Sequence, residues 1–256
     1  MSDPFDALKG NERTKRFFRG EIDAGSLSHA YILEGEEGTG KHTLALAVAQ
    51  ALAGDTPEGR KIAEGLSPDV FTVGLRGDKK QLTVDAIRAV KESASLKPND
   101  LSFRFYIIEN AECLNVQAQN AALKILEEPP EGTYFFLLCK SAPMLLPTVR
   151  SRAPVIRMQR FSYEEMCELL QKDPEAAAVR RNDPRFFEGC VRSCGGSYGR
   201  ALALIRGEAP KERDGGIAEL FSKLKNEAEL LTFIRDIPGK RQEFDQFLSL
   251  LQSALR

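Results

Sequence analysis

Residues 30–54 of the 256-residue chain read AYILEGEEGTGKHTLALAVAQALAG and carry the strongest signal for the fold class. The apolar run at 30–33 is typical of a short buried strand, and the run at 43–53 predicts a largely buried helix that ends at Gly54. Between them lies a glycine-rich loop. Strand, glycine loop and helix in this order are typical of a phosphate-binding unit, because the loop and the helix N-terminus present backbone N–H groups to an anion.

The loop follows the P-loop pattern G-x-x-x-x-G-K-[ST] up to its lysine and departs from it at the next position. In that motif the lysine reaches the terminal phosphates of a nucleotide, and the hydroxyl after it holds Mg²⁺. Here the position is taken by His42, and the hydroxyl of Thr43 comes one residue too late. We therefore predict a phosphate loop with impaired metal-assisted hydrolysis; a plain glycine turn is the alternative. The candidate nucleotide-binding residues are Gly35, Gly38, Gly40, Lys41 and Thr43.

A second nucleotide motif is expected where the apolar strand FYII (105–108) ends. Glu109 stands where a metal-orienting carboxylate belongs, but Asn110 cannot take a proton from water, and Glu112 lies two residues further on. With two hydrolytic features altered, the sequence predicts a non-hydrolysing relative of P-loop ATPases. It leaves open whether ATP and Mg²⁺ still bind, and whether Glu109 and Glu112 are ordinary loop carboxylates.

The rest of the first 160 residues alternates strand-like and helix-like segments. Apolar and β-branched runs separated by helical periodicity favour a parallel sheet with helices on both faces. Asn115 is placed to cap the helix that Pro129 and Pro130 end. We predict an α/β domain with five parallel strands. The strands expected after the first lie at 69–73, 103–108, 133–139 and 154–158.

The composition changes after Arg160, where strand-like runs give way to three short helical segments. The polar, turn-rich stretch EAPKERDGG (208–216) is a candidate linker, and amphipathic helices follow it. The last of these would leave an apolar stripe with few residues to cover it. We expect two complete domains and the beginning of a third, truncated one.

Balanced charge excludes a globally basic nucleic-acid binder. Lys and Arg number 36 against 37 Asp and Glu, for a net charge of −1, and 42% apolar residues exclude a disordered chain. No segment has the pattern of a signal peptide or a membrane span, so a cytoplasmic protein is expected. The odd number of scattered cysteines indicates reduced thiols. They are Cys113, Cys139, Cys167, Cys190 and Cys194.

Residues 114–152 are more specific than the glycine loop. The run NVQAQNAALKILEEPPEGTYFFLL, followed by LLPTVRSR, resembles the clamp-loader branch of the AAA+ proteins, and within it the delta-prime type of bacterial DNA polymerase III subunit. LSHAYILEGEEGTGK (27–41) and SPDVFTV (67–73) match the same family. The resemblance implies an AAA+ domain over residues 1–160, a small all-α lid over 161–207 and the start of an all-α oligomerisation collar over 208–256.

In that family a Ser-Arg pair after the L-P-T stretch is an arginine finger that enters the ATP site of the neighbouring subunit. Ser151 and Arg152 occupy this position, so the resemblance implies that they act in trans. A guanidinium suits the task because it is always charged and spreads several donors over phosphate oxygens. The alternative is a surface arginine that caps the fifth strand.

The departures from the family's hydrolysing subunits point to its non-hydrolysing branch. Those subunits carry Ser or Thr after the P-loop lysine, Asp-Glu after the third strand and a lid arginine where this chain has Gly199, with Arg200 displaced by one position. Their sensor threonine region reads Cys-Lys-Ser here, at 139–141. Residues 44–104 contain no cysteine, so the zinc site of many relatives is not expected, and no other metal site is predicted.

The resemblance implies a subunit without catalysis of its own in the DNA-directed DNA polymerase III holoenzyme. Its partners would be the tau/gamma motor and the delta subunit in a hetero-oligomeric ring, with the sliding clamp and primed DNA reached through the assembly, and with no membrane. One alternative is an autonomous ATPase in which Thr43 replaces the missing hydroxyl and Glu112 the missing base. Another is a stand-alone DNA-binding module that uses the short basic stripe of Arg180, Arg181 and Arg185.

Overall fold

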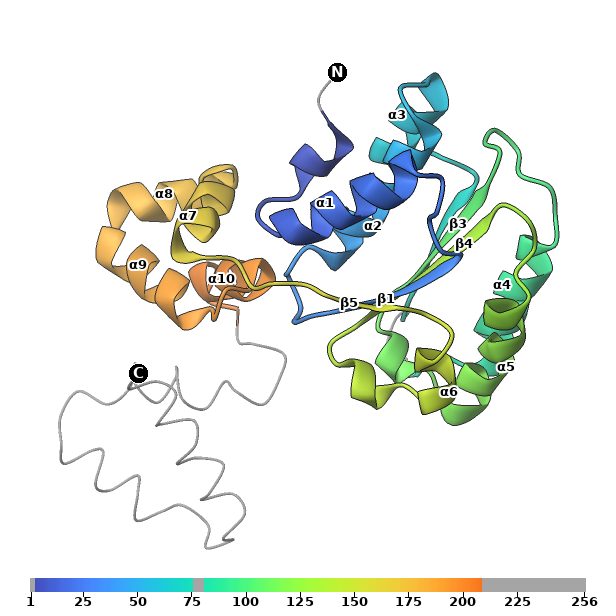
Figure 1. Ribbon diagram of the computed structural model, residues 1–256. Coiled ribbons are helices and arrows are strands. Elements are labelled where there is room, and N and C mark those ends of the chain that lie inside the picture. The colour runs from blue at the N-terminus through green and yellow to red at the C-terminus, as the bar shows by residue number, and fades with distance from the viewer. Residues whose placement is uncertain (1–2, 76–80, 209–256) are drawn as a thin grey trace, which may run out of the picture. The chain divides into compact units, whose positions relative to one another are not determined.

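The computed structural model describes residues 3–75 and 81–208 (Figure 1). Its centre is a five-stranded parallel sheet with the strand order β2-β3-β4-β1-β5, as the alternating segments predicted. The predicted collar lies outside the described residues, apart from residue 208. The strands are β1 (Ala30–Glu34), β2 (Val70–Val73), β3 (Arg104–Ile108), β4 (Thr133–Cys139) and β5 (Val155–Arg157).

Helices cover both faces of the sheet, which explains the continuous apolar runs of its central strands. Side chains alternate between the faces, so Tyr31 and Leu33 pack on one side and Ile32 on the other. The first face is covered by α1 (Glu12–Asp23), α2 (Lys41–Ala53) and α3 (Pro57–Ala63), and the second by α4 (Val84–Ala94), α5 (Val116–Glu127) and α6 (Pro147–Arg150) (Figure 1).

Local sequence signals explain where several helices begin and end. The Asn115 side chain accepts a hydrogen bond from the Ala118 N–H at 2.8 Å and caps α5, as predicted. Thr56 caps α3 in the same way through the Gly59 N–H. The sequence analysis did not predict α3, although a threonine followed by proline at the first helical position is a typical start signal.

Up to residue 208, four helices follow the sheet: α7 (Tyr163–Gln171), α8 (Pro174–Asn182), α9 (Pro184–Ser193) and α10 (Tyr198–Ile205). Three helical segments were predicted, and α8 was missed despite the cap signal of Asp173, which accepts from two backbone N–H groups. Of the arginines in the basic stripe, Arg180 lies over the ring of Phe187, 5.5 Å from its centroid. Across the described ranges no helix is long and apolar enough to cross a membrane.

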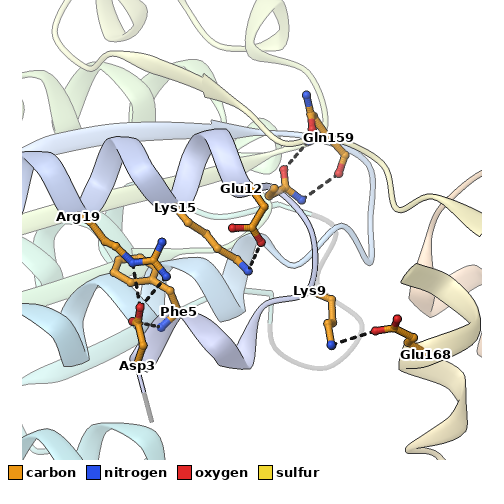
Figure 2. A network of polar contacts seen from close by, with 9 residues as sticks. Asp3, Phe5, Lys9, Glu12, Lys15, Arg19, Gln159 and Glu168 are labelled. Carbon is orange, nitrogen blue, oxygen red and sulfur yellow. Dashed lines mark hydrogen bonds and ion pairs between the residues drawn. The ribbon is translucent and has the colours of Figure 1, made fainter. Parts of the chain in front are cut away.

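Polar contacts fix the N-terminal segment and α1 against the rest of the fold (Figure 2). Arg19 donates to the Asp3 carboxylate at 2.6 and 2.9 Å. Asn11 accepts from the Gln159 N–H at 2.6 Å and donates to the Gln159 carbonyl at 3.2 Å, tying the start of α1 to the chain beyond β5. Lys9 pairs with Glu168 of α7 at 3.0 Å. The segment before α1 therefore contacts both the sheet domain and the helices that follow it.

A buried carboxylate holds the loop that leads into β3. Asp69 is fully buried, and its two oxygens accept from the N–H groups of Asn99, Asp100 and Leu101 at 2.7 to 3.0 Å and from the Asn99 side chain. Burial alone would raise the pKa of Asp69, but these donors outweigh it and hold the pKa below its ordinary value of 3.8.

We expect Asp69→Asn to lower the free energy of unfolding by about 2 kcal/mol at neutral pH, because the new amide N–H₂ would face backbone donors. Urea denaturation measures this. Since the folded pKa is depressed, the carboxylate's contribution is present above pH 3.8 and is lost as the pH falls through the folded pKa, so the two proteins converge in acid. Asp85→Asn is the control, because the Asp85 side chain of α4 is exposed; an equal loss there would contradict a specific role for Asp69.

Candidate functional site

A cavity of about 550 Å³ lies where the glycine loop, the segment after β3 and the segment before α1 meet. Most sequence-predicted nucleotide residues line it together. A volume of this size suits a ligand as large as a nucleotide. From the glycine loop and α2 it receives Gly38, Gly40, Lys41, His42 and Thr43, and from the segment after β3 it receives Glu109, Asn110 and Glu112.

The glycine loop has the backbone of a phosphate cradle. Gly38 and Gly40 have φ values of 75° and 85°, a region that glycine enters freely, and α2 begins at Lys41. The Lys41 ammonium folds back on the loop and donates to the carbonyls of Gly35 and Glu36, the latter at 2.7 Å. Gly35 thus contributes through its carbonyl. Burial lowers the pKa of Lys41, so an anion in the cavity would stabilise its charged form.

His42, which replaces the hydroxyl of the P-loop, contacts Glu109, which stands at the metal-orienting position. His42 Nδ1 lies 2.7 Å from Glu109 Oε1, and both side chains are partly exposed to the cavity. This hydrogen bond lowers the pKa of Glu109, which keeps the carboxylate ionised beside the imidazole. Glu109 was predicted to belong to the site, whereas His42 was noted only as a departure from the P-loop pattern. Their pairing was not predicted, because they are 67 positions apart in the chain.

These residues do not fit a magnesium ion. Mg²⁺ prefers oxygen ligands in octahedral geometry, and here an imidazole stands in the hydroxyl position and engages the carboxylate itself. Within residues 3–75 and 81–208, no three His, Cys, Asp or Glu side chains gather closely enough to hold a metal ion. Glu112 contributes a different feature: its Oε2 atom is buried and has no hydrogen-bond partner among the described residues.

The start of α10 closes over the glycine loop. Ser197 Oγ donates to the Glu37 carbonyl at 2.5 Å, and the Tyr198 N–H donates to the Gly38 carbonyl at 3.1 Å. A Cβ atom on Gly38 would lie under 3.0 Å from the Gly199 nitrogen, so the two backbones meet closely here. Gly199 holds the position of the family's lid arginine and offers no side chain to the cavity.

Arg152 and Ser151 lie apart from this cavity, beyond the end of α6. The Arg152 guanidinium donates to Glu127 at the end of α5, through Nε at 2.8 Å and also through Nη2. Its Nη1 donates to the Thr148 carbonyl at 2.7 Å and to Ser151 Oγ at 3.2 Å. The arginine side chain is 29% exposed and Glu127 is 47% exposed, so the pair lies at the surface. Glu127 belongs to the E-E-P-P motif, but nothing in the sequence indicated that it binds Arg152.

Comparison with protein families matches residues 10–162 to the model described as "DNA polymerase III, delta subunit". Subunit delta' of DNA polymerase III from Escherichia coli K12 is 30% identical over 207 residues, which cover 75% of this chain and 58% of that protein. Subunit tau of DNA polymerase III from Bacillus subtilis 168 is 28% identical over 212 residues, which cover 78% of this chain and 37% of that protein. The chain therefore spans between about a third and three-fifths of the length of these relatives.

Solved structures share the fold at low sequence identity. A DNA polymerase III gamma subunit-related protein from Thermotoga maritima has a TM-score of 0.51 and 18% identity, with 93% of this chain and 91% of that chain covered. A single-residue variant of RuvB from the same organism has a TM-score of 0.54 and 18% identity, with 80% of this chain and 63% of that chain covered. With the parallel sheet, these similarities confirm the predicted AAA+-like α/β fold.

Proposed function

The chain belongs to the delta-prime and clamp-loader family of DNA polymerase III subunits, and on this premise we propose that it is a non-hydrolysing clamp-loader subunit that supplies an arginine finger in trans. The observation that carries the proposal is the separation of the two sites. Arg152 lies at the surface beyond α6, whereas the chain's own cavity is lined by the glycine loop and the residues after β3.

The position of Arg152 supports action on a neighbour. Its guanidinium is at the surface and is held by partners at the end of α5 and in α6, so it is accessible to a second subunit. A charged, planar donor group stabilises the oxygens that gain charge as a phosphoryl bond breaks. The side chain of Ser151 donates to the Thr148 carbonyl at 3.0 Å and accepts from Arg152, which makes it a positioning residue for the finger.

The cavity of the chain itself supports the non-hydrolysing half of the proposal. His42 replaces the hydroxyl ligand of the P-loop, and Asn110 replaces the carboxylate that would activate water. We infer the following domain organisation: an AAA+ domain at 1–160, a lid at 161–207 and the start of a collar at 208–256. The tau/gamma motor and the delta subunit would be its partners in the ring, and the assembly would bring it to the sliding clamp and primed DNA.

Steady-state ATP hydrolysis tests this function. The isolated chain is expected to show no turnover above background, and adding it to the motor and delta subunits should raise clamp- and DNA-stimulated hydrolysis by the mixture. The variant under test is Arg152→Ala. Arg150→Ala is its control, and a chain with that change should raise hydrolysis by the mixture as the wild-type chain does. Turnover by the isolated chain that disappears in Lys41→Ala would contradict the proposal and favour the autonomous ATPase.

A further inference from the structure

The contact between His42 and Glu109 has a consequence for what the cavity binds. Both residues stand where a P-loop ATPase holds its metal ion: His42 replaces the hydroxyl ligand, and the carboxylate of Glu109 is engaged by the imidazole. An imidazole can donate to a carboxylate, and the 2.7 Å contact satisfies both groups within the cavity wall. A divalent cation at this place would have to break that hydrogen bond. The imidazole of His42 would then lie beside the ion in place of the usual hydroxyl ligand.

We propose that the cavity binds a nucleoside diphosphate or triphosphate without a divalent cation, with the His42–Glu109 pair filling the place of the metal. This inference concerns the chain's own site and does not depend on Arg152 or on assembly. It also separates two properties that usually occur together in P-loop proteins, because binding is retained while the means to organise hydrolysis are absent.

The phosphate end of the cavity has cationic and backbone donors that need no metal. The first N–H groups of the 13-residue helix α2 have no partner within the helix and carry its positive dipole end. Lys41 donates to two loop carbonyls, which it can exchange for phosphate oxygens at the same location. Lys140 and Lys172 are also among the residues that line the cavity, and Lys140 lies 4.0 Å from the Glu37 carboxylate.

The cavity lining also includes apolar side chains that suit a flat ring. Leu8, Phe161, Leu169 and Tyr198 line it, and they come from three separate segments that meet there. Leu8 and Phe161 are almost completely buried, and Leu8 also packs against the Gly40 Cα, where a Cβ atom would lie too close. A nucleotide requires apolar lining together with a polyphosphate cradle, and this cavity offers both.

The site should not distinguish the diphosphate from the triphosphate. A third phosphate is normally held by the cation and by a lid arginine. Here the pair of His42 and Glu109 takes the place of the cation, and Gly199 stands where the lid arginine would be. We expect the dissociation constants of ADP and ATP to agree within about threefold, which is well under 1 kcal/mol in binding free energy.

Isothermal titration of the full chain with ADP, in excess EDTA and in excess MgCl₂, tests the proposal without any variant. The expected result is saturable binding with the same affinity in both buffers. Binding that weakens tenfold or more in EDTA, or no binding of ADP to the folded chain in either buffer, would overturn it. A failure here leaves the trans role of Arg152 intact, since that role is measured on a different site.

Variants then locate the binding. His42→Ser should make ADP affinity depend on MgCl₂, because it frees Glu109 and restores a hydroxyl, whereas the wild type stays indifferent. Lys41→Ala should weaken ADP by about tenfold or more, the loss expected for a charge-assisted hydrogen bond. Arg152→Ala is the matched control and should bind ADP as the wild type does. If His42→Ser also binds equally with EDTA and MgCl₂, the pair is not what makes the site independent of the metal.

Discussion

Replacing Arg152 by alanine is expected to lower ATP hydrolysis at the neighbouring motor site by about 10³-fold or more, the effect of removing an arginine finger. The physical reason is that a guanidinium supplies positive charge and directed donors to oxygens whose charge increases in the transition state. The measurement is single-turnover hydrolysis in the reconstituted assembly with clamp and primed DNA. In an assembly with further motor sites, total steady-state hydrolysis is expected to fall by a smaller factor.

Two further variants show whether the effect belongs to this side chain. Arg150→Ala removes an arginine two residues earlier, in α6 itself, and is expected to leave hydrolysis unchanged. Arg152→Lys keeps the charge but loses the fork of donors, so it should recover only a small part of the activity. Gel filtration establishes that each variant still assembles. Unchanged hydrolysis by Arg152→Ala in an intact assembly would remove the finger assignment.

Gly38→Ala is expected to lower the free energy of unfolding by about 2–4 kcal/mol, because it combines a strained backbone with a steric clash. Its φ of 75° disfavours any residue with a side chain, and the new Cβ would lie under 3.0 Å from the Gly199 nitrogen. The atom that must move is backbone at the start of α10. The substitution should therefore also separate α10 from the glycine loop and break the bonds from Ser197 and Tyr198.

Denaturant unfolding measures the stability, and amide hydrogen exchange of Tyr198 reports the contact with the loop. Gly20→Ala is the control: Gly20 lies inside α1, and a Cβ there would meet nothing within 4 Å, so alanine should stabilise the protein by about 0.5–1 kcal/mol. If both substitutions had the same effect, close packing at Gly38 would not be the reason for its glycine.

The sequence was most informative where structure depends on near neighbours. All five strands followed from apolar runs bounded by turns, and Asn115 marked the start of α5 through a bond to a residue three positions away. The glycine spacing likewise predicted the tight loop between β1 and α2. These features arise within a few residues, so periodicity and capping are enough to find them.

Contacts between distant segments could not be predicted in the same way. Nothing near His42 signals that its partner is Glu109, and nothing near Arg152 signals Glu127, since each pair forms only when the sheet brings separate loops together. The bond from Ser197 to the glycine loop joins residues 160 positions apart. The missed helix α8 is a different case: its cap residues were visible, but its polar composition hides the apolar face.

The ion pair between Arg152 and Glu127 means that any outside anion must compete for the guanidinium. Nε, Nη1 and Nη2 all donate within the chain, so an outside anion that takes the whole fork of donors must displace Glu127. An exposed pair of this kind is worth about 0.2–1 kcal/mol, which a single carboxylate on a neighbour could only match, whereas a polyphosphate with several charges exceeds it. Arg152 therefore keeps Glu127 as its partner when the outside anion carries little charge, and exchanges it for an anion that carries several charges.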